Sequence, residues 1–359
     1  MIIYIIFFLL NMLIGALLLN KKNKNNPAHK SAYLIFTTLQ YGILAGLRST
    51  NVGWDTITYS RLFSEVPDSF QAVAHTHFRE EIGFNYLCSL IKICGGDYQT
   101  FLLITSIFIV GSCCIFIYRH SHNVLMSVFI ILCFPYYYTS LDIIRHYLAV
   151  SFFLLGYKYV IQRDFIKFLI FILLGSLFHR IAFLFLAFYF IRYFKWNAIT
   201  AVLSIAVTAF LTVYLDTIST AIMVLLHKTD YTNSYWVGVE AGGGKTMIMY
   251  LIVLIIAILG FHNIKPKSRT IIDSDSVTQI MFLFLCAVIF TKARMIIRLM
   301  VVFIPLMAIA MPRFLCDQER AGNKKTMRIL NGVFICIGTA YHVYLLASNW
   351  QNVVPYETY

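Results

Sequence analysis

Long apolar runs recur along nearly the whole chain and are separated by short polar or basic segments. A helix needs about 20 apolar residues to cross the ~30 Å hydrocarbon core of a bilayer, and many of the runs have about that length. We predict membrane-spanning helices at residues 1–20, 31–47, 99–118, 123–139, 141–161, 198–216, 247–262, 277–292, 295–312 and 328–347. The pattern therefore predicts an all-α polytopic membrane protein with about ten full transmembrane helices.

Residues 166–193 require a separate interpretation, because basic residues flank this apolar stretch on both sides. Positive flanks are typical of cytoplasmic loops, so both ends are expected on the same side of the membrane. A break at Phe178-His179-Arg180 leaves two arms of about 13 residues, each about 20 Å long and too short to cross comfortably. We predict a re-entrant or short helical hairpin over 166–193, with His179 and Arg180 near its tip.

Composition and charge support the membrane interpretation. Of the 359 residues, 60% are hydrophobic and 13% are charged, whereas soluble domains contain about 25% charged residues. The loops predicted to be cytoplasmic account for the whole net charge of +13, as the positive-inside rule requires. Nucleic acid is therefore not an expected partner. We predict one integral-membrane domain over 1–359, outer loops at 48–98 and 217–246, and both termini outside.

Ionisable residues gather at the outer ends of the predicted spans. A charge near the bilayer centre costs about 2.5–3.5 kcal/mol, so such residues are functional candidates. They are Arg48, Asp142, Arg145, His146, His179, Arg180, Arg294 and Arg298. Several arginines on one side indicate a pocket for a multiply anionic ligand, and a diphosphate suits the planar guanidinium. For Arg180 and Arg298, an interfacial arginine that reaches toward lipid headgroups is an equal alternative.

Metal and cofactor signals are weak. The eight cysteines lie mostly in apolar runs, with no C-x-x-C pair, and buried thiols explain them better than metal ligands. We expect no metal site and no cofactor. One divalent ion, bound to a diphosphate near Asp55 or Asp142, remains an open alternative.

Five segments match a family pattern in order. The first runs from Arg48 to Tyr59 and contains Gly-x-Asp-Thr. The others are Glu81-Ile82-Gly83-Phe84 with the Gly95-Gly96-Asp97-Tyr98 turn, Ile144-Arg145-His146-Tyr147-Leu148-Ala149, Ser176-Leu177-Phe178-His179, and Arg294 to Arg298 before a span that ends near Pro305 or Pro312. Together they resemble the EpsG-like exopolysaccharide repeat-unit polymerases, relatives of the Wzy polymerases. This chain has His146 where the family commonly has Gln, and Arg180 where it has a small or neutral residue.

The resemblance implies a glycosyltransferase with a multi-span architecture analogous to the GT-C class. It implies transfer of a growing glycan from polyprenyl diphosphate to the next carrier-linked unit, in exopolysaccharide, capsule or O-antigen synthesis. The leaving diphosphate needs cations in place, and the attacking hydroxyl needs a base. The expected catalytic residues are His179, Asp55, Arg145 and Arg294, with Glu81 a third candidate for the base. The expected substrate-binding residues are Arg48, Tyr59, Glu81, Asp142, His146, Arg180 and Arg298.

Two other function classes stay open. A flippase for lipid-linked oligosaccharide needs the same outward cations, but the sequence lacks two similar halves. A membrane glycan acyltransferase needs a deep histidine, for which His179 is available. The expected location is the bacterial cytoplasmic membrane. The expected partners are polyprenyl-diphosphate-linked oligosaccharide and membrane lipids, and a chain-length regulator and a flippase are further candidates.

Overall fold

The chain is helical throughout the part that the structure, a computed structural model, describes. That part comprises residues 1–75, 81–191, 294–320 and 324–359, with a few isolated helical residues between 202 and 217. These residues contain no strand, and their one isolated β-bridge joins Arg48 to Thr358. The chain divides into two compact units, residues 1–191 with 338–359, and residues 192–337. The prediction of an all-α protein is therefore confirmed for the described residues.

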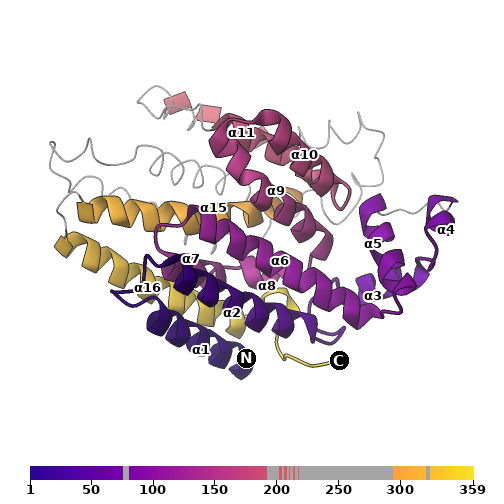
Figure 1. Cartoon of the computed structure of the whole chain (residues 1–359), viewed down its shortest axis with the longest axis horizontal. Helices are drawn as coiled ribbons and strands as arrows, with labels where there is room; N and C mark the ends of the chain where they lie inside the picture. Colours follow the sequence, from indigo (N-terminus) through magenta and orange to yellow (C-terminus); the bar gives the residue numbers. More distant parts are fainter. Residues whose placement is uncertain are drawn as a thin grey trace. The chain divides into compact units, whose positions relative to one another are not determined.

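The first unit contains most of the described helices (Figure 1). They are α1 (Ile2–Leu18), α2 (Pro27–Gly46), α3 (Thr56–Glu65), α4 (Phe70–His75), α5 (Ile82–Ile93), α6 (Tyr98–His120), α7 (Val124–Cys133), α8 (Tyr136–Ser140), α9 (Ile144–Gln162), α10 (Phe165–Ser176), the 3-10 helix η1 (Arg180–Leu186) and α11 (Ala187–Ile191). The unit also includes the last part of α16 (Lys324–Ala347) and the 3-10 turn η4 (Trp350–Asn352).

In the second unit the structure describes α15 (Arg294–Arg320) and the start of α16. Helix α15 covers the predicted span 295–312 and carries Pro305 and Pro312 in its interior. The predicted spans 247–262 and 277–292 lie outside the described residues, as do most of 198–216 and all but the first residue of the outer loop 217–246.

Polar side chains at the helix starts explain where several helices begin. Asn26 caps α2 by accepting a hydrogen bond from the backbone of Ala28, and Pro27 follows at the first helical position. Asp97 forms a capping box with Thr100 at the start of α6. Such caps satisfy backbone N–H groups that have no partner within the helix. The polar residues between apolar runs therefore set the starts of α2 and α6.

Small residues let α2 and α6 pack closely. A Cβ on Gly42 would lie 3.0 Å from Ile107 Cγ1, and one on Gly46 would lie 2.7 Å from Leu103 Cα. The two glycines are four residues apart, which is the small-xxx-small spacing of close helix pairs in membranes. Because residues 42 and 46 of α2 meet 107 and 103 of α6, the two helices run antiparallel. Gln99 of α6 also donates to the Gly46 carbonyl.

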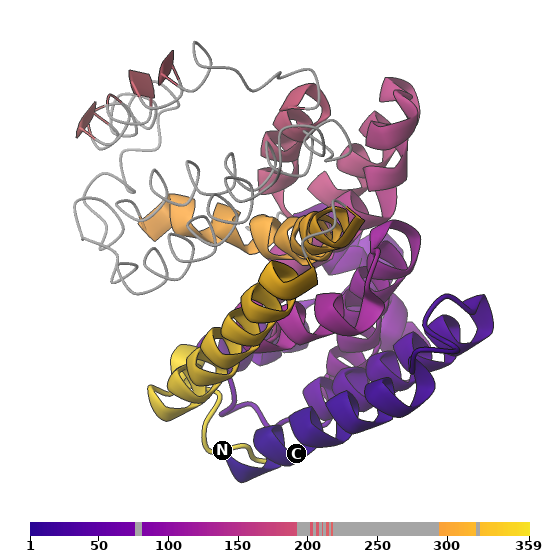
Figure 2. The same cartoon turned by 90° about the vertical axis from the view of Figure 1, so that its left-hand side faces the viewer.

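The directions in which the helices run place the loops between them at the two ends of the first unit. Helix α1 also runs antiparallel to α2, since Asn11 bonds to Thr37 and Gln40 bonds to the Phe7 carbonyl. The loops at 19–26 and 121–123 therefore share one end, together with the 163–164 turn. The end of α2, the starts of α6 and α9 and both chain termini share the other (Figures 1 and 2). The described loops of the first unit that are predicted to be cytoplasmic thus lie together, away from the termini.

Apolar side chains on the outside of the helices are those expected of a membrane protein. On α1, Ile2, Ile6, Leu9, Leu13 and Leu17 recur at helical spacing and are all more than half exposed. By length and composition, 98–120 and 328–347 are able to cross a bilayer, and several other described helices are apolar but shorter. The protein is therefore a helical membrane protein. The number of spans and the side on which each loop lies stay predictions.

Two predicted segments can be compared with the structure in detail. The span predicted over 123–139 differs from the prediction, because it is two helices, α7 and α8. The chain breaks at Phe134 and Pro135, and proline cannot donate a helical hydrogen bond. In the predicted hairpin over 166–193, α10 ends at Ser176 and the chain reverses before η1. The Tyr189 hydroxyl then donates to the Arg163 carbonyl at 2.8 Å, so the two arms lie side by side. Their depth in a membrane stays a prediction.

Candidate functional site

The connection between α8 and α9 joins three segments of the candidate site. The Leu141 carbonyl accepts hydrogen bonds from Arg48 Nη2 at 2.9 Å and from Thr56 Oγ1 at 3.3 Å. The next residue, Asp142, accepts the backbone N–H of Asp55 at 2.7 Å through Oδ1. Asp142 was expected in the first turn of a helix, but α9 begins at Ile144. This position before the helix lets its carboxylate reach the 48–55 loop.

The Gly-x-Asp-Thr sequence at residues 53–56 has a clear structural basis. Gly53 has a φ of +97°, and a Cβ there would lie 2.9 Å from the Leu141 carbonyl oxygen. Only glycine adopts this conformation without strain. Three residues later, Thr56 Oγ1 donates to the Val52 carbonyl at 2.7 Å and closes the loop. The glycine and threonine therefore shape the loop that carries Asp55.

Arg48 points into the protein. It is 1% exposed, and its guanidinium donates to the Ala45 and Leu141 carbonyls and, at 3.4 Å, to Ser106 Oγ. A buried charge needs such acceptors to offset lost hydration. Among the described residues, the hydrogen bonds of Arg48 therefore link the end of α2 to the 141–142 connection. Contact with substrate, expected from the sequence, stays a prediction for this residue.

Arg145 stands at the centre of a second cluster, on the first turn of α9. Its Nη1 donates to Glu81 Oε2 at 3.0 Å, and both side chains are about one-fifth exposed, at 23% and 18%. The guanidinium carbon lies 5.8 Å from the centre of the Tyr59 ring and 5.6 Å from that of Phe84. Cation–π contacts of this kind hold a guanidinium in place. Helices α3, α5 and α9 thus converge on Arg145.

The turn after α10 meets the start of α5 through a glycine. The N–H of Gly83 donates to the Leu177 carbonyl at 2.7 Å, and a Cβ on Gly83 would lie 2.7 Å from that same oxygen. Glycine therefore permits this approach. On the other side of the turn, the Arg180 backbone N–H donates to Glu81 Oε1 at 3.4 Å. Glu81 links the turn to Arg145, while the Arg180 side chain is exposed.

His179 directly precedes η1, and its ring accepts a hydrogen bond. The backbone N–H of Ile181 donates to His179 Nδ1 at 3.2 Å. A neutral imidazole that accepts at Nδ1 carries its hydrogen on Nε2. The His146 ring, buried on α9, lies 5.5 Å from the His179 ring between centroids. His179 is therefore oriented by its own backbone turn and by α9.

The structure brings most of the predicted site residues to one end of the first unit. They are Asp55, Tyr59, Glu81, Asp142, Arg145, His146, His179 and Arg180, with Arg48 beneath them. Arg294 and Arg298 lie on the first turns of α15, and their side chains are outside the described residues. Their contribution to the site stays a prediction. No described group of three potential ligands is arranged to hold a metal ion.

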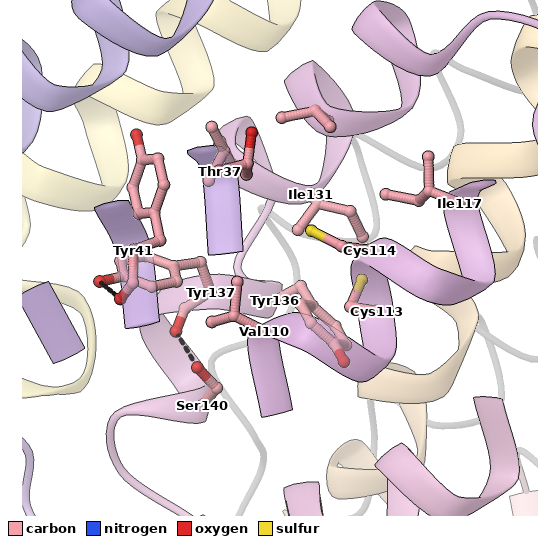
Figure 3. Close-up of a pocket in the computed structure, with 12 residues that line it drawn as sticks. Thr37, Tyr41, Val110, Cys113, Cys114, Ile117, Ile131, Tyr136, Tyr137 and Ser140 are labelled. Atoms are coloured by element: carbon pink, nitrogen blue, oxygen red, sulfur yellow. Dashed lines mark hydrogen bonds between the residues drawn. The ribbon is translucent and has the colours of Figure 1, made fainter. Parts of the chain in front are cut away.

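A small buried cavity lies between α2, α6, α7 and α8 (Figure 3). Its volume is about 20 Å³, which is room for about one water molecule. Tyr41, Tyr136 and Tyr137 line it together with the thiols of Cys113 and Cys114. Ser140 Oγ donates to the Tyr137 carbonyl at its edge. The cavity is too small for a sugar and belongs to the packing beneath the site.

Residues 349–359 also lie at this end of the first unit, although the sequence pattern does not mark them as part of the site. Residues 352–359 bond to the backbone of residues 47–53, for example from the Ser49 N–H to the Glu357 carbonyl at 2.8 Å. The available signal was the polar character of this segment, which contains Asn352, Tyr356, Glu357, Thr358 and Tyr359. Nothing in them indicated which loop they would meet.

The fold and the site define a class of protein, a helical membrane protein with arginine, histidine and carboxylate side chains clustered at one end of its helices. The profile of the EpsG family matches residues 31–358, nearly the whole chain, and the protein belongs to that family. This confirms the resemblance seen in the sequence. No curated protein and no solved structure matches the chain.

Proposed function

We propose that this protein is a polymerase of lipid-linked oligosaccharide repeat units at the outer face of the bacterial cytoplasmic membrane. It transfers the growing glycan from polyprenyl diphosphate to a hydroxyl of the next carrier-linked unit. Membership of the EpsG family over residues 31–358 is the observation that carries the proposal. The cluster around Arg145 supports it, because a reaction with a diphosphate leaving group needs a fixed cation.

Arg145 is the residue proposed to stabilise the departing diphosphate. Its guanidinium is already held by Tyr59, Phe84 and Glu81, so little reorganisation is needed as negative charge develops. His179, with its hydrogen on Nε2, is proposed as a second donor to the same group. Arg294 and Arg298 remain candidates for further phosphate contacts.

Asp55 is the residue proposed as general base. Among the described residues its carboxylate makes no hydrogen bond, although it stands at the N-cap of α3. Both oxygens of Glu81 are engaged, by Arg145 and by the Arg180 N–H, and His179 Nδ1 accepts the Ile181 N–H. Of the three candidates, Asp55 therefore has the most accessible acceptor atoms.

The proposed step balances without a cofactor. The acceptor hydroxyl loses its proton to Asp55, and its oxygen forms a bond to the anomeric carbon of the growing glycan. The bond from that carbon to the diphosphate oxygen breaks, and polyprenyl diphosphate departs with the bonding electrons. Direct attack inverts the anomeric centre. A chain-length regulator and a flippase are proposed partners that control product size and supply the substrate.

Reconstitution tests the proposal. Purified protein in liposomes receives its polyprenyl-diphosphate-linked repeat unit without nucleotide or acyl donor, and a gel resolves the products. We expect a ladder of longer glycans that is lost in Arg145→Gln and Asp55→Asn. The matched control is Arg61→Gln, since Arg61 lies on α3 near the site but its side chain is 71% exposed.

The same experiment separates the other function classes. A flippase would leave the repeat unit unextended and move it to the opposite leaflet. An acyltransferase would modify the glycan only after an acyl donor is added. Either result in place of the ladder contradicts the polymerase proposal.

A further inference from the structure

The C-terminal segment, residues 349–359, lies along the loop that leads to Asp55. The N–H of Ser49 donates to the Glu357 carbonyl at 2.8 Å, and the N–H of Gly53 donates to the Asn352 carbonyl at 3.0 Å. In the other direction, the N–H of Tyr359 donates to the Leu47 carbonyl at 3.1 Å. The backbone of residues 47–53 therefore finds partners about 300 residues away in the sequence.

Side chains strengthen this contact. Asn352 Nδ2 donates to the Asn51 carbonyl at 3.1 Å. Glu357 Oε2 accepts from Asn51 Nδ2 at 2.9 Å and from Ser49 Oγ at 3.4 Å. Asn352 thus bonds to the backbone of Asn51, and Glu357 bonds to its side chain. Hydrogen bonds that involve a charged group, such as the Glu357 carboxylate, are stronger than neutral ones.

The C-terminal segment is itself fixed to the helices. The Tyr356 hydroxyl donates to the Leu44 carbonyl at 2.9 Å near the end of α2. The Tyr4 hydroxyl of α1 donates to the Val353 carbonyl at 3.1 Å, and Trp350 Nε1 donates to Thr139 Oγ1 at 3.2 Å. The segment is therefore anchored on α1, α2 and α8 and does not depend on the loop for its position.

The loop that carries Asp55 is consequently held from two sides. On one side Asp142 accepts the Asp55 N–H and Leu141 accepts Arg48 and Thr56. On the other side the C-terminal segment bonds as far along the loop as Gly53, two residues before Asp55. A carboxylate that accepts a proton in a transition state must be placed accurately, and small displacements cost large factors in rate.

We propose that the C-terminal segment positions Asp55 for the reaction, and that Asn352 and Glu357 are positioning residues. This inference rests on the proposed role of Asp55 as general base. The segment adds a second set of hydrogen-bond partners to a loop that is already bonded to the 141–142 connection. Its loss therefore acts on turnover through Asp55 and leaves substrate affinity nearly unchanged.

The test uses the full chain with Asn352→Gly and Glu357→Ala. Glycine tolerates the positive φ of 55° at position 352, so this change removes the side-chain amide without straining the backbone. Glu357→Gln keeps an oxygen acceptor for Asn51 and serves as the conservative rescue. Tyr359→Ala is the control, because this exposed side chain makes no hydrogen bond among the described residues and its backbone N–H is retained.

Two readouts are needed. Hydrogen exchange reports on the Ser49 and Gly53 amides without reference to activity, and steady-state kinetics separates kcat from KM. We expect Asn352→Gly and Glu357→Ala to speed exchange of these amides and to lower kcat by about tenfold, with KM nearly unchanged. Glu357→Gln should recover most of the loss, and Tyr359→Ala should match the wild type.

Combination with Asp55→Asn shows whether the effect passes through Asp55. If the C-terminal segment acts on the base, Asn352→Gly adds no further loss to the slow extension that Asp55→Asn retains below the level of a visible ladder. An equal tenfold loss in both backgrounds overturns the inference, and so does unchanged exchange at Ser49 and Gly53. A wild type that makes no polymer contradicts the proposed function instead, and the exchange measurement then decides whether the segment holds the loop.

Discussion

Replacement of Gly53 by alanine tests the structural basis of the loop that carries Asp55. The φ of Gly53 is +97°, and a Cβ there would lie 2.6 Å from Thr56 Oγ1 and 2.9 Å from the Leu141 oxygen. A left-handed conformation costs a non-glycine residue about 1–2 kcal/mol, and overpacking costs about 1–3 kcal/mol. Together the penalty is about 2–5 kcal/mol. The loop relieves it by moving away from Leu141, which displaces Asp55.

Gly95→Ala is a matched control for this change. Gly95 also has a positive φ, +78°, but a Cβ there meets nothing within 4 Å. Its penalty is therefore the backbone cost alone, about 1–2 kcal/mol. We expect Gly53→Ala to lower the thermal unfolding midpoint more than Gly95→Ala and to reduce polymerisation about 100-fold, while Gly95→Ala keeps near-normal activity. Equal unfolding midpoints and equal rates for the two variants would refute the proposed contact between Gly53 and Leu141.

Three further predictions address other contacts of the first unit. Gly83→Ala places a Cβ 2.7 Å from the Leu177 oxygen, so it should lower turnover while circular dichroism stays helical, and normal turnover would contradict the close approach. Thr56→Val removes the donor to the Val52 carbonyl at 2.7 Å and should cost about 1–3 kcal/mol of stability, measured by denaturant unfolding in detergent. Asp97→Ala removes the cap of α6 and should cost about 1 kcal/mol at neutral pH. Hydrogen bonds from Thr100 lower the pKa of Asp97 in the folded protein, so its contribution is present above the unfolded pKa and is lost as pH falls through the folded one. Thermal unfolding of wild type and Asp97→Ala should therefore converge in acid, and a constant difference would argue against the cap.

Apolar run length and flanking basic residues were sufficient to predict several helices of the first unit. The predicted span 99–118 is α6, which begins at Tyr98 directly after the Asp97 cap. The predicted break at Phe178-His179-Arg180 falls where α10 ends and η1 begins. These predictions succeeded because run length and flanking charge are local properties of the sequence.

The direction in which a side chain points, and contacts between residues far apart in the sequence, could not be predicted in the same way. The sequence marks Arg48 as a charge near the end of a span, but its burial depends on carbonyl groups at 45 and 141 that only the fold brings together. Contact between the C-terminal segment and the 47–53 loop is also non-local, and backbone partners leave little trace in side-chain identity. The acceptor role of His179 Nδ1 depends on one local turn geometry.

The central claim is that the residues around Arg145 and Asp55 catalyse glycan transfer from a lipid diphosphate. The most direct measurement is the length of glycan formed by purified protein in liposomes from its own carrier-linked repeat unit, with wild type, Arg145→Gln, Asp55→Asn and Arg61→Gln compared at equal protein content. We expect a ladder for wild type and Arg61→Gln and no visible ladder for the other two. A ladder from Arg145→Gln and Asp55→Asn as long as that from the wild type would contradict the assigned site, and a wild type that leaves every unit unextended would contradict the proposed function itself.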